Sequence, residues 1–272
     1  MPTVPVRQPA VAGQFYPGRA ETLRADIEGY LATGAAKIPA LGAVIPHAGY
    51  MYSGHVAGAV YARLQLPRRF VILCPNHTGI GAPLAIMSRG RWATPLGEAA
   101  IDEQTADALK KTFSLITEDE DAHRGEHALE VQLPFLQVLR PDFRFVPITV
   151  GTGRYEVLAA LGVSIARVLE ALGEDAMVIA SSDMNHYESD AATRVKDEKA
   201  VAEVMALDPK GLYETVQEHN ITMCGYGPAV AMLTATKLLG ATRGELVKYA
   251  TSGDIAGDRD RVVGYAGMIV SK

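Results

Sequence analysis

Several common signatures are missing from this chain of 272 residues, and each absence removes a class of protein. No run of basic residues occurs, and 26 Lys and Arg face 31 Asp and Glu, so nothing points to nucleic acid or an anionic membrane. No apolar stretch reaches the roughly 18 residues of a membrane span. The first residues lack the apolar core of a signal peptide. We therefore expect a cytoplasmic protein that binds neither nucleic acid nor membrane.

The usual catalytic fingerprints are also missing. The sequence contains no Walker A loop, no G-x-G-x-x-G and no G-x-S-x-G, so nucleotide binding and an α/β-hydrolase nucleophile have no support. Its two cysteines, Cys74 and Cys224, form no C-x-x-C zinc pattern. Free thiols are expected in a cytoplasmic chain, and one of them can serve as a ligand or nucleophile. Cys74 lies within the apolar run FVILCP, which indicates a structural role.

Short apolar runs alternate with amphipathic segments along most of the chain. The pattern predicts strands at 41–46, 69–75, 83–88, 143–150 and 176–182, and two closing strands that could be antiparallel at 246–253 and 262–270. Helices are expected after caps at Ser53 and Asp102, and at 126–139 despite Pro134, 155–172, 191–207, 209–218 and 227–239. This alternation predicts an α/β fold: a single domain over 1–272, with a central, mostly parallel or mixed sheet flanked by helices.

Polar residues gather where the predicted strands end. His47 follows the first of these strands, His77 the next, and Asp183 and His186 follow AMVIASS, while Cys224 stands just before a Gly-Pro helix start. In open α/β sheets, ligands bind beyond the carboxyl ends of the strands. Each residue alone is equally well explained as a turn, cap or core residue. Their joint occurrence at consecutive strand ends favours a shared site.

This set of side chains is suited to a metal. Two imidazoles and a thiolate, from His47, His77 and Cys224, suit iron, copper or zinc. Three protein ligands leave open positions, as a reactive metal site needs. His186 would be a natural general acid or base, and Asp183 could orient it or a ligand. Two further histidines are assigned to helices, His55 within one and His219 at the end of another.

A competing motif is HRGEH at 123–127, which matches the H-x-x-E-H signature of inverted zinc peptidases. That mechanism needs both histidines on one face of a helix. Gly125 and the acidic run before the motif indicate a boundary between loop and helix instead. A zinc-dependent hydrolase therefore remains an alternative, through this motif or through the strand-end site.

Eight blocks resemble one family, and they occur in its order along nearly the whole chain: RQPAVAGQFYP, IPHAGYMYSG, PNHTG, TPLG, EHALEVQLPFL, SSDMNHY, CGYGP and SGD. The chain resembles the Memo family, named after a mediator of cell motility, whose bacterial and archaeal members are called AmmeMemoRadiSam system protein B. The resemblance implies a single α/β domain similar to the class III extradiol dioxygenases, which are non-haem iron enzymes that open catechol rings. It places the metal-binding histidines at His47 and His77, the cysteine ligand at Cys224, and the pocket Asp and His at Asp183 and His186.

The resemblance to the dioxygenases stops at the third ligand. Those enzymes use two histidines and a carboxylate, whereas Cys224 stands at the third position here, so ring cleavage does not follow and copper or another redox role gains weight. We expect a metal-binding protein and candidate non-haem iron- or copper-dependent oxidoreductase of unknown substrate, with zinc less expected.

The alternative of another class is a non-catalytic protein that binds a peptide or partner. The family label implies co-occurrence with a radical SAM protein and a companion protein. Four tyrosines flank the strand-end site and could stack on an aromatic or peptide ligand, although they could equally be rim or core aromatics: Tyr16, Tyr50, Tyr52 and Tyr187.

Overall fold

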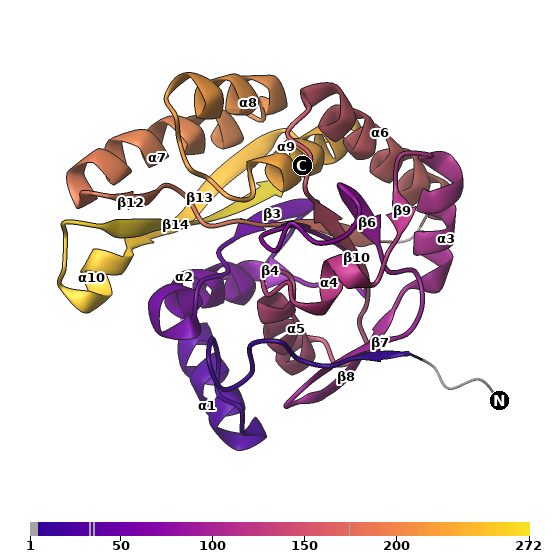
Figure 1. Cartoon of the computed structure of the whole chain (residues 1–272), viewed down its shortest axis with the longest axis horizontal. Coiled ribbons are helices and arrows are strands. Elements are labelled where there is room, and N and C mark those ends of the chain that lie inside the picture. Colours follow the sequence, from indigo (N-terminus) through magenta and orange to yellow (C-terminus); the bar gives the residue numbers. More distant parts are fainter. Residues whose placement is uncertain (1–4, 33, 35, 174) are drawn as a thin grey trace.

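A large mixed sheet forms the centre of the protein in the computed structural model, which describes residues 5–32, 34, 36–173 and 175–272 (Figure 1). Its twelve strands follow the order β1-β7-β8-β10-β5-β11-β3-β14-β12, with β13 beside β14, β6 beside β10, and β9 beside β6. The strands are β1 (Val6–Arg7), β3 (Gly42–Ile45), β5 (Arg69–Pro75), β6 (Leu84–Ile86), β7 (Arg91–Thr94), β8 (Gly97–Ile101), β9 (Thr117–Glu118), β10 (Arg144–Val150), β11 (Ala176–Ser181), β12 (His186–Glu188), β13 (Arg243–Thr251) and β14 (Val262–Ser271). A separate pair joins β2 (Ile38–Pro39) and β4 (Leu64–Gln65).

The middle of the sheet is parallel, because β8, β10, β5, β11 and β3 run in one direction. The strand β14 runs antiparallel to β3 and β13. Parallel strands are buried on both faces, which explains why these segments consist of nearly continuous apolar residues. Along β5, Val71 and Leu73 pack into one core, and Phe70, Ile72 and Cys74 pack into the other.

Helices cover both faces of the sheet (Figure 1). On one face lie α3, α6, α7, α8 and α9, and on the other lie α1, α2 and α5. The helices are α1 (Ala20–Leu31), α2 (Tyr50–Arg63), α3 (Glu103–Thr112), α4 (Asp121–Arg124), α5 (Leu133–Leu139), α6 (Tyr155–Leu172), α7 (Asp190–Met205), α8 (Pro209–Glu218), α9 (Tyr226–Leu238) and α10 (Ser252–Ala256). No helix in the described part of the chain is both long and apolar enough to cross a membrane.

The α/β class and most of the expected elements are confirmed. The strand expected at 69–75 has those bounds, the closing strands pair antiparallel, and the helix at 155–172 is α6. Asp102 caps α3, since its side chain accepts a hydrogen bond from the Thr105 N–H. That the chain forms one domain stays a prediction.

Two helix starts were predicted wrongly. The helix after His47 begins at Tyr50 with Gly49 as its N-cap, so Ser53 is inside α2, where its hydroxyl donates to the Ala48 carbonyl at 2.8 Å. The helix expected at 126–139 begins later, as a short 3₁₀ turn at Glu130–Gln132 that leads into α5. Pro134 therefore lies in the first turn of α5, where its missing N–H has no partner to lose.

Candidate metal centre

The structure brings His47, His77 and Cys224 together at the carboxyl edge of the sheet. β11 lies between β3 and β5 in the parallel sheet, so the loops that carry His47 and His77 leave from the same edge. One nitrogen of each histidine and the cysteine sulfur all lie within 4.8 Å of one another. The Cys224 Sγ is 3.2 Å from the His47 Nε2, and the two imidazole centroids are 5.2 Å apart. Ligation by these residues stays a prediction, but their donor atoms are within reach of one ion.

The hydrogen bonds around Ser181 determine which His47 nitrogen carries the proton. The Ser181 hydroxyl donates its only hydrogen to the Ala128 carbonyl at 2.5 Å. The Gln132 amide nitrogen, which donates to the Pro46 carbonyl at 3.1 Å, also donates to this hydroxyl at 2.8 Å. A hydroxyl accepts two hydrogen bonds, so the His47 Nδ1 at 3.0 Å donates the second one. The His47 Nε2 lone pair is therefore left facing Cys224.

Glu126 orients His77 in the same way. Its carboxylate accepts from the His77 Nδ1–H at 2.9 Å and from the His77 backbone N–H at 2.6 Å, which leaves Nε2 as the donor atom for a metal. Burial acts to raise the pKa of Glu126, but these hydrogen bonds and a third from the Ala128 N–H hold that pKa below its ordinary value. A carboxylate behind a ligating imidazole fixes the ring and makes it more basic.

His127 is a third imidazole at this site. From the sequence, His127 was predicted only as part of the peptidase motif. Its ring stacks on His77, with centroids 4.7 Å apart and planes 19° apart, and lies 5.5 Å from the His47 centroid. His77, Glu126 and His127 also form a group that could hold an ion. Because the Glu126 carboxylate already accepts three N–H bonds, it is better suited to support His77 than to bind metal.

The peptidase geometry suggested by HRGEH is not formed. The helix α4 ends at Arg124 with Gly125 as its C-cap, so His123 and His127 do not share a helix face. His123 is buried against Trp92, with ring centroids 5.6 Å apart, whereas His127 faces His47 and His77. Within the described residues, no candidate metal group includes His123.

Burial favours the neutral forms of His47 and Cys224. It lowers the pKa of His47 well below its ordinary value, with further lowering from the neighbouring histidines. Burial and the nearby Asp183 carboxylate raise the pKa of the Cys224 thiol. Burial also raises the pKa of Asp183, whose carboxylate accepts from the His47 and Ala48 N–H groups at 2.7 and 3.3 Å. Asp183 thus holds the backbone of the His47 loop, and its role in orienting a ligand stays a prediction.

His186 lies at the edge of the site. Its Nδ1–H donates to the Thr222 carbonyl at 2.9 Å, and its backbone N–H donates to the Thr222 hydroxyl at 2.7 Å, so Nε2 remains available for proton transfer. The general acid or base role of His186 stays a prediction.

The four tyrosines occupy different environments. Tyr16 and Tyr50 are each only 3% exposed, and their hydroxyls donate to Glu130 at 2.6 Å and to the Val131 carbonyl at 2.7 Å. Tyr52 is half-buried, and Tyr187 is 65% exposed. Contact between these four rings and a substrate stays a prediction, with the ring of Tyr187 the most accessible of them.

A cavity of about 230 Å³ adjoins two of the three candidate ligands. His77 and Cys224 form part of its lining, together with Asn76, Thr152 and Tyr226 from the loops after β5 and β10 and from the start of α9. Drug-sized ligands occupy pockets of roughly 300–1,000 Å³, so this cavity fits a smaller molecule.

Comparisons with known proteins identify relatives of this chain along nearly its whole length. The family model described as Memo-like protein matches residues 7–269. The MEMO1 family protein MTH_45 of Methanothermobacter thermautotrophicus is 42% identical over 273 residues, which cover 96% of this chain and 99% of that protein. A MEMO1 family protein of Methanosarcina mazei is 45% identical over 267 residues, covering 97% and 99%.

One solved structure shares the fold at low sequence identity. The uncharacterized protein JW3007 from Escherichia coli K12 superposes with a TM-score of 0.58 at 14% identity, over 84% of this chain and 98% of that one. The family is established by the sequence matches, since they extend over almost the entire chain. The chain belongs to the Memo family.

Proposed function

We propose that this protein binds iron or copper through His47, His77 and Cys224 and acts as an oxidoreductase on a small molecule. One observation carries the proposal: a nitrogen from each of two imidazoles, whose Nδ1 atoms have fixed hydrogen-bond partners, and one sulfur lie within 4.8 Å of one another. Soft thiolate with imidazole suits copper, iron and zinc, and three protein ligands leave positions open for a substrate. We also propose a cytoplasmic location, where the two free cysteines would stay reduced.

Several residues of the chain would each have a separate role around such an ion. The metal supplies redox chemistry when bound. Asp183 and Glu126 hold the loop and the ring that present the donor atoms. The cavity beside His77 and Cys224 would hold the small molecule. His186 lies outside the lining of this cavity, and we propose that it donates or accepts a proton at the edge of the site through Nε2. Resemblance to dioxygenases does not identify the reaction, because the third ligand is a cysteine.

Anaerobic loading with iron(II) or copper(I), followed by oxygen uptake over a panel of small aromatic and thiol compounds, tests the proposal. Turnover that disappears in Cys224→Ser and persists in Cys74→Ala supports it, since Cys74 is a buried cysteine outside the candidate ligand set. Metal binding that is unchanged in Cys224→Ser would remove the basis of the proposal.

One observation favours binding without turnover as a second candidate. Tyr187 is 65% exposed beside His186, with ring centroids 5.6 Å apart, and the Arg261 guanidinium lies 5.7 Å from the Tyr187 centroid. An exposed aromatic ring next to a cation is suited to a peptide or partner protein. The radical SAM protein and its companion are proposed partners of this kind. Capture of either protein by wild type but not by Tyr187→Ala, with no turnover of the panel, would favour this candidate.

A further inference from the structure

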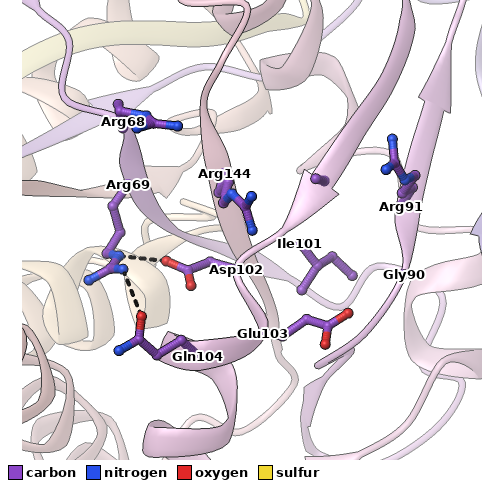
Figure 2. Close-up of a pocket in the computed structure, with 10 residues that line it drawn as sticks. Arg68, Arg69, Gly90, Arg91, Ile101, Asp102, Glu103, Gln104 and Arg144 are labelled. Atoms are coloured by element: carbon purple, nitrogen blue, oxygen red, sulfur yellow. Dashed lines mark hydrogen bonds and ion pairs between the residues drawn. The ribbon is translucent and has the colours of Figure 1, made fainter.

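A second cavity, of about 500 Å³, lies at the opposite edge of the sheet from the candidate metal centre (Figure 2). Four arginines line it, and they come from three separate segments: Arg68 and Arg69 at the start of β5, Arg144 at the start of β10, and Arg91 at the start of β7. The metal centre lies beyond the carboxyl ends of β3 and β5, whereas this cavity lies at the amino ends of β5 and β10, next to the carboxyl end of β8. Strand β5 has seven residues, and at ~3.3 Å per residue it separates the two edges by roughly 20 Å.

The sheet register places three of these arginines, Arg69, Arg144 and Arg91, along one row across the strands. Arg69 pairs with Arg144 across β5 and β10, Arg144 pairs with Ala100 on β8, and Ala100 pairs with Arg91 on β7. Paired residues on neighbouring strands project to the same face, and like charges directly opposite one another are destabilising. The small Ala100 leaves space between Arg144 and Arg91. Such a row of positive charges around an open space would attract an anion.

The neighbouring carboxylates do not neutralise all four arginines equally. Asp102 lies 2.5 Å from the Arg69 guanidinium in a buried ion pair, and Figure 2 shows Arg69 extended towards Asp102 and Gln104. Arg68 and Arg91 pair with carboxylates at 3.0 and 3.7 Å, but the four side chains of these two pairs are 45–63% exposed. Exposed pairs of this kind contribute little stability and exchange partners readily.

Arg144 is the strongest candidate for an anion contact. Among the residues that the structure describes, no carboxylate forms an ion pair with Arg144. Glu103 also lines the cavity, but its carboxylate lies 2.8 Å from the Arg89 guanidinium. The lining therefore carries four positive and two negative side chains, in a protein whose net charge is −5.

Backbone hydrogen bonds hold the walls of this cavity in place. The Arg144 N–H donates to the Arg68 carbonyl at 2.7 Å, and the Ile101 N–H donates to the Gly90 carbonyl at 3.1 Å. Ile101, which also lines the cavity, is 2% exposed and anchored in the core. A cavity built on strand ends is preorganised, which lowers the entropy lost when a ligand binds.

We propose that this cavity binds a small molecule through its phosphate or diphosphate group. The planar guanidinium donates two parallel hydrogen bonds to phosphate oxygens, which makes arginine the preferred residue for this group. The volume is that of a small-molecule site rather than of a bare ion. The phosphate contacts Arg144 and its neighbouring arginines, and the organic part lies against Ala100 and Ile101.

Calorimetric titration of the metal-free protein with inorganic pyrophosphate at low salt tests this proposal. Wild type is expected to show saturable binding, and Arg144→Gln to weaken it roughly tenfold or more, because hydrogen bonds to charged groups contribute about 1.5–3 kcal/mol. Arg19→Gln is the matched control, since the Arg19 side chain is 84% exposed and lies outside the cavity. Cys224→Ser should bind pyrophosphate like wild type, which separates this site from the metal centre.

Three results would overturn the proposal. They are the absence of saturable binding by wild type, equal affinity in Arg144→Gln and wild type, and malonate binding as tight as that of pyrophosphate. The last result would assign the cavity to dicarboxylates instead. Arg144 is exposed at the strand end, so its replacement is not expected to impair folding.

Discussion

At the scale of single residues, Glu126 is a buried side chain that orients the candidate metal ligand His77. Its carboxylate holds both the ring and the backbone N–H of His77. We predict that Glu126→Gln lowers metal affinity by roughly 10–100-fold while the protein stays folded, because the neutral amide makes the His77 imidazole less basic. Competition with a chromophoric chelator measures this affinity.

The exposed Glu98→Gln provides the control for this experiment, since Glu98 lies on the far hairpin strand β8. Equal metal affinity in Glu126→Gln and Glu98→Gln would show that the carboxylate has no part in tuning His77.

A second buried carboxylate, Asp197, predicts a pH dependence of stability. Burial raises the pKa of Asp197 to about 7, although its carboxylate accepts from the Tyr249 hydroxyl at 2.6 Å and from the Asn185 N–H at 2.8 Å. The nearby Arg194 lowers this pKa and Glu188 raises it. Between about pH 4 and pH 7 the folded state keeps a proton that the unfolded state has released, so the contribution of Asp197 to stability falls as pH rises.

We therefore predict that the free energy of unfolding of Asp197→Asn, relative to that of wild type, is higher at pH 7.5 than at pH 5. Each pKa unit corresponds to about 1.4 kcal/mol, so the difference in unfolding free energy between wild type and variant should change by roughly 2–3 kcal/mol over this interval. Urea unfolding at the two pH values measures it. A difference that does not vary with pH would contradict the raised pKa of Asp197.

At the scale of elements, the contact between α1 and α2 depends on a glycine. A Cβ at Gly58 would lie 2.5 Å from the Tyr30 Cβ and 2.6 Å from the Tyr30 carbonyl oxygen, so backbone would have to move. We predict that Gly58→Ala destabilises the protein by about 1–3 kcal/mol, the usual cost of overpacking. The midpoint of urea unfolding measures this change.

Gly29, on α1 itself, is the matched control, because a Cβ there meets nothing within 4 Å. Gly29→Ala should stabilise by about 0.5–1 kcal/mol, since alanine loses less backbone entropy in a helix. If Gly58→Ala and Gly29→Ala shifted the midpoint of urea unfolding alike, the close approach of α1 to α2 would not explain the effect of Gly58→Ala.

The same scale shows how far the sequence determines the elements. The buried strands β5, β10 and β11 were predictable because parallel strands covered on both faces are continuous apolar runs. The hairpin of β7 and β8 was not predicted, since RWAT and GEAAI are short and lack a clean alternation of apolar residues. Its turn depends on Gly97, whose φ of 113° only glycine adopts readily.

Local patterns also could not determine where the helices around the site begin. Ser53 is a residue type typical of N-caps, but the turn at Gly49 starts α2 earlier, with the Tyr50 N–H bonded to the Phe15 carbonyl at 2.7 Å. That bond joins residues far apart in sequence. A tertiary contact of this kind overrides the local preference for a serine cap.

The candidate ligands were predictable and their supporting residues were not. His47 and His77 were found because the carboxyl ends of parallel strands meet at one edge. Cys224 lies between α8 and α9 instead of after a strand, and it was found by its place just before a Gly-Pro helix start and by the family resemblance. Glu126, Ser181 and Gln132 act through hydrogen bonds between separate elements, which one sequence does not reveal. The HRGEH motif contains both Glu126 and His127. Because the motif was interpreted as that of a peptidase, the position of these two residues beside His77 was not predicted.

At the scale of the whole molecule, metal binding should stabilise the folded protein. No ion can bind the assembled donor set in the unfolded chain, so an ion at 100 times its Kd adds about 2.7 kcal/mol. We predict that copper(I) or iron(II) raises the Tm of wild type and of Cys74→Ala, and leaves the Tm of Cys224→Ser nearly unchanged. Anaerobic thermal unfolding monitored by circular dichroism measures this, and an equal rise in all three proteins would indicate binding elsewhere.

The proposed centre holds one ion through two imidazoles and one sulfur at the carboxyl edge of the sheet. X-ray absorption spectroscopy of the metal-loaded protein tests it most directly, because it identifies the atoms bound to the metal. We predict one sulfur and at least two imidazole nitrogens in wild type, and loss of the sulfur alone in Cys224→Ser. A coordination shell without sulfur in the wild-type protein would contradict the account.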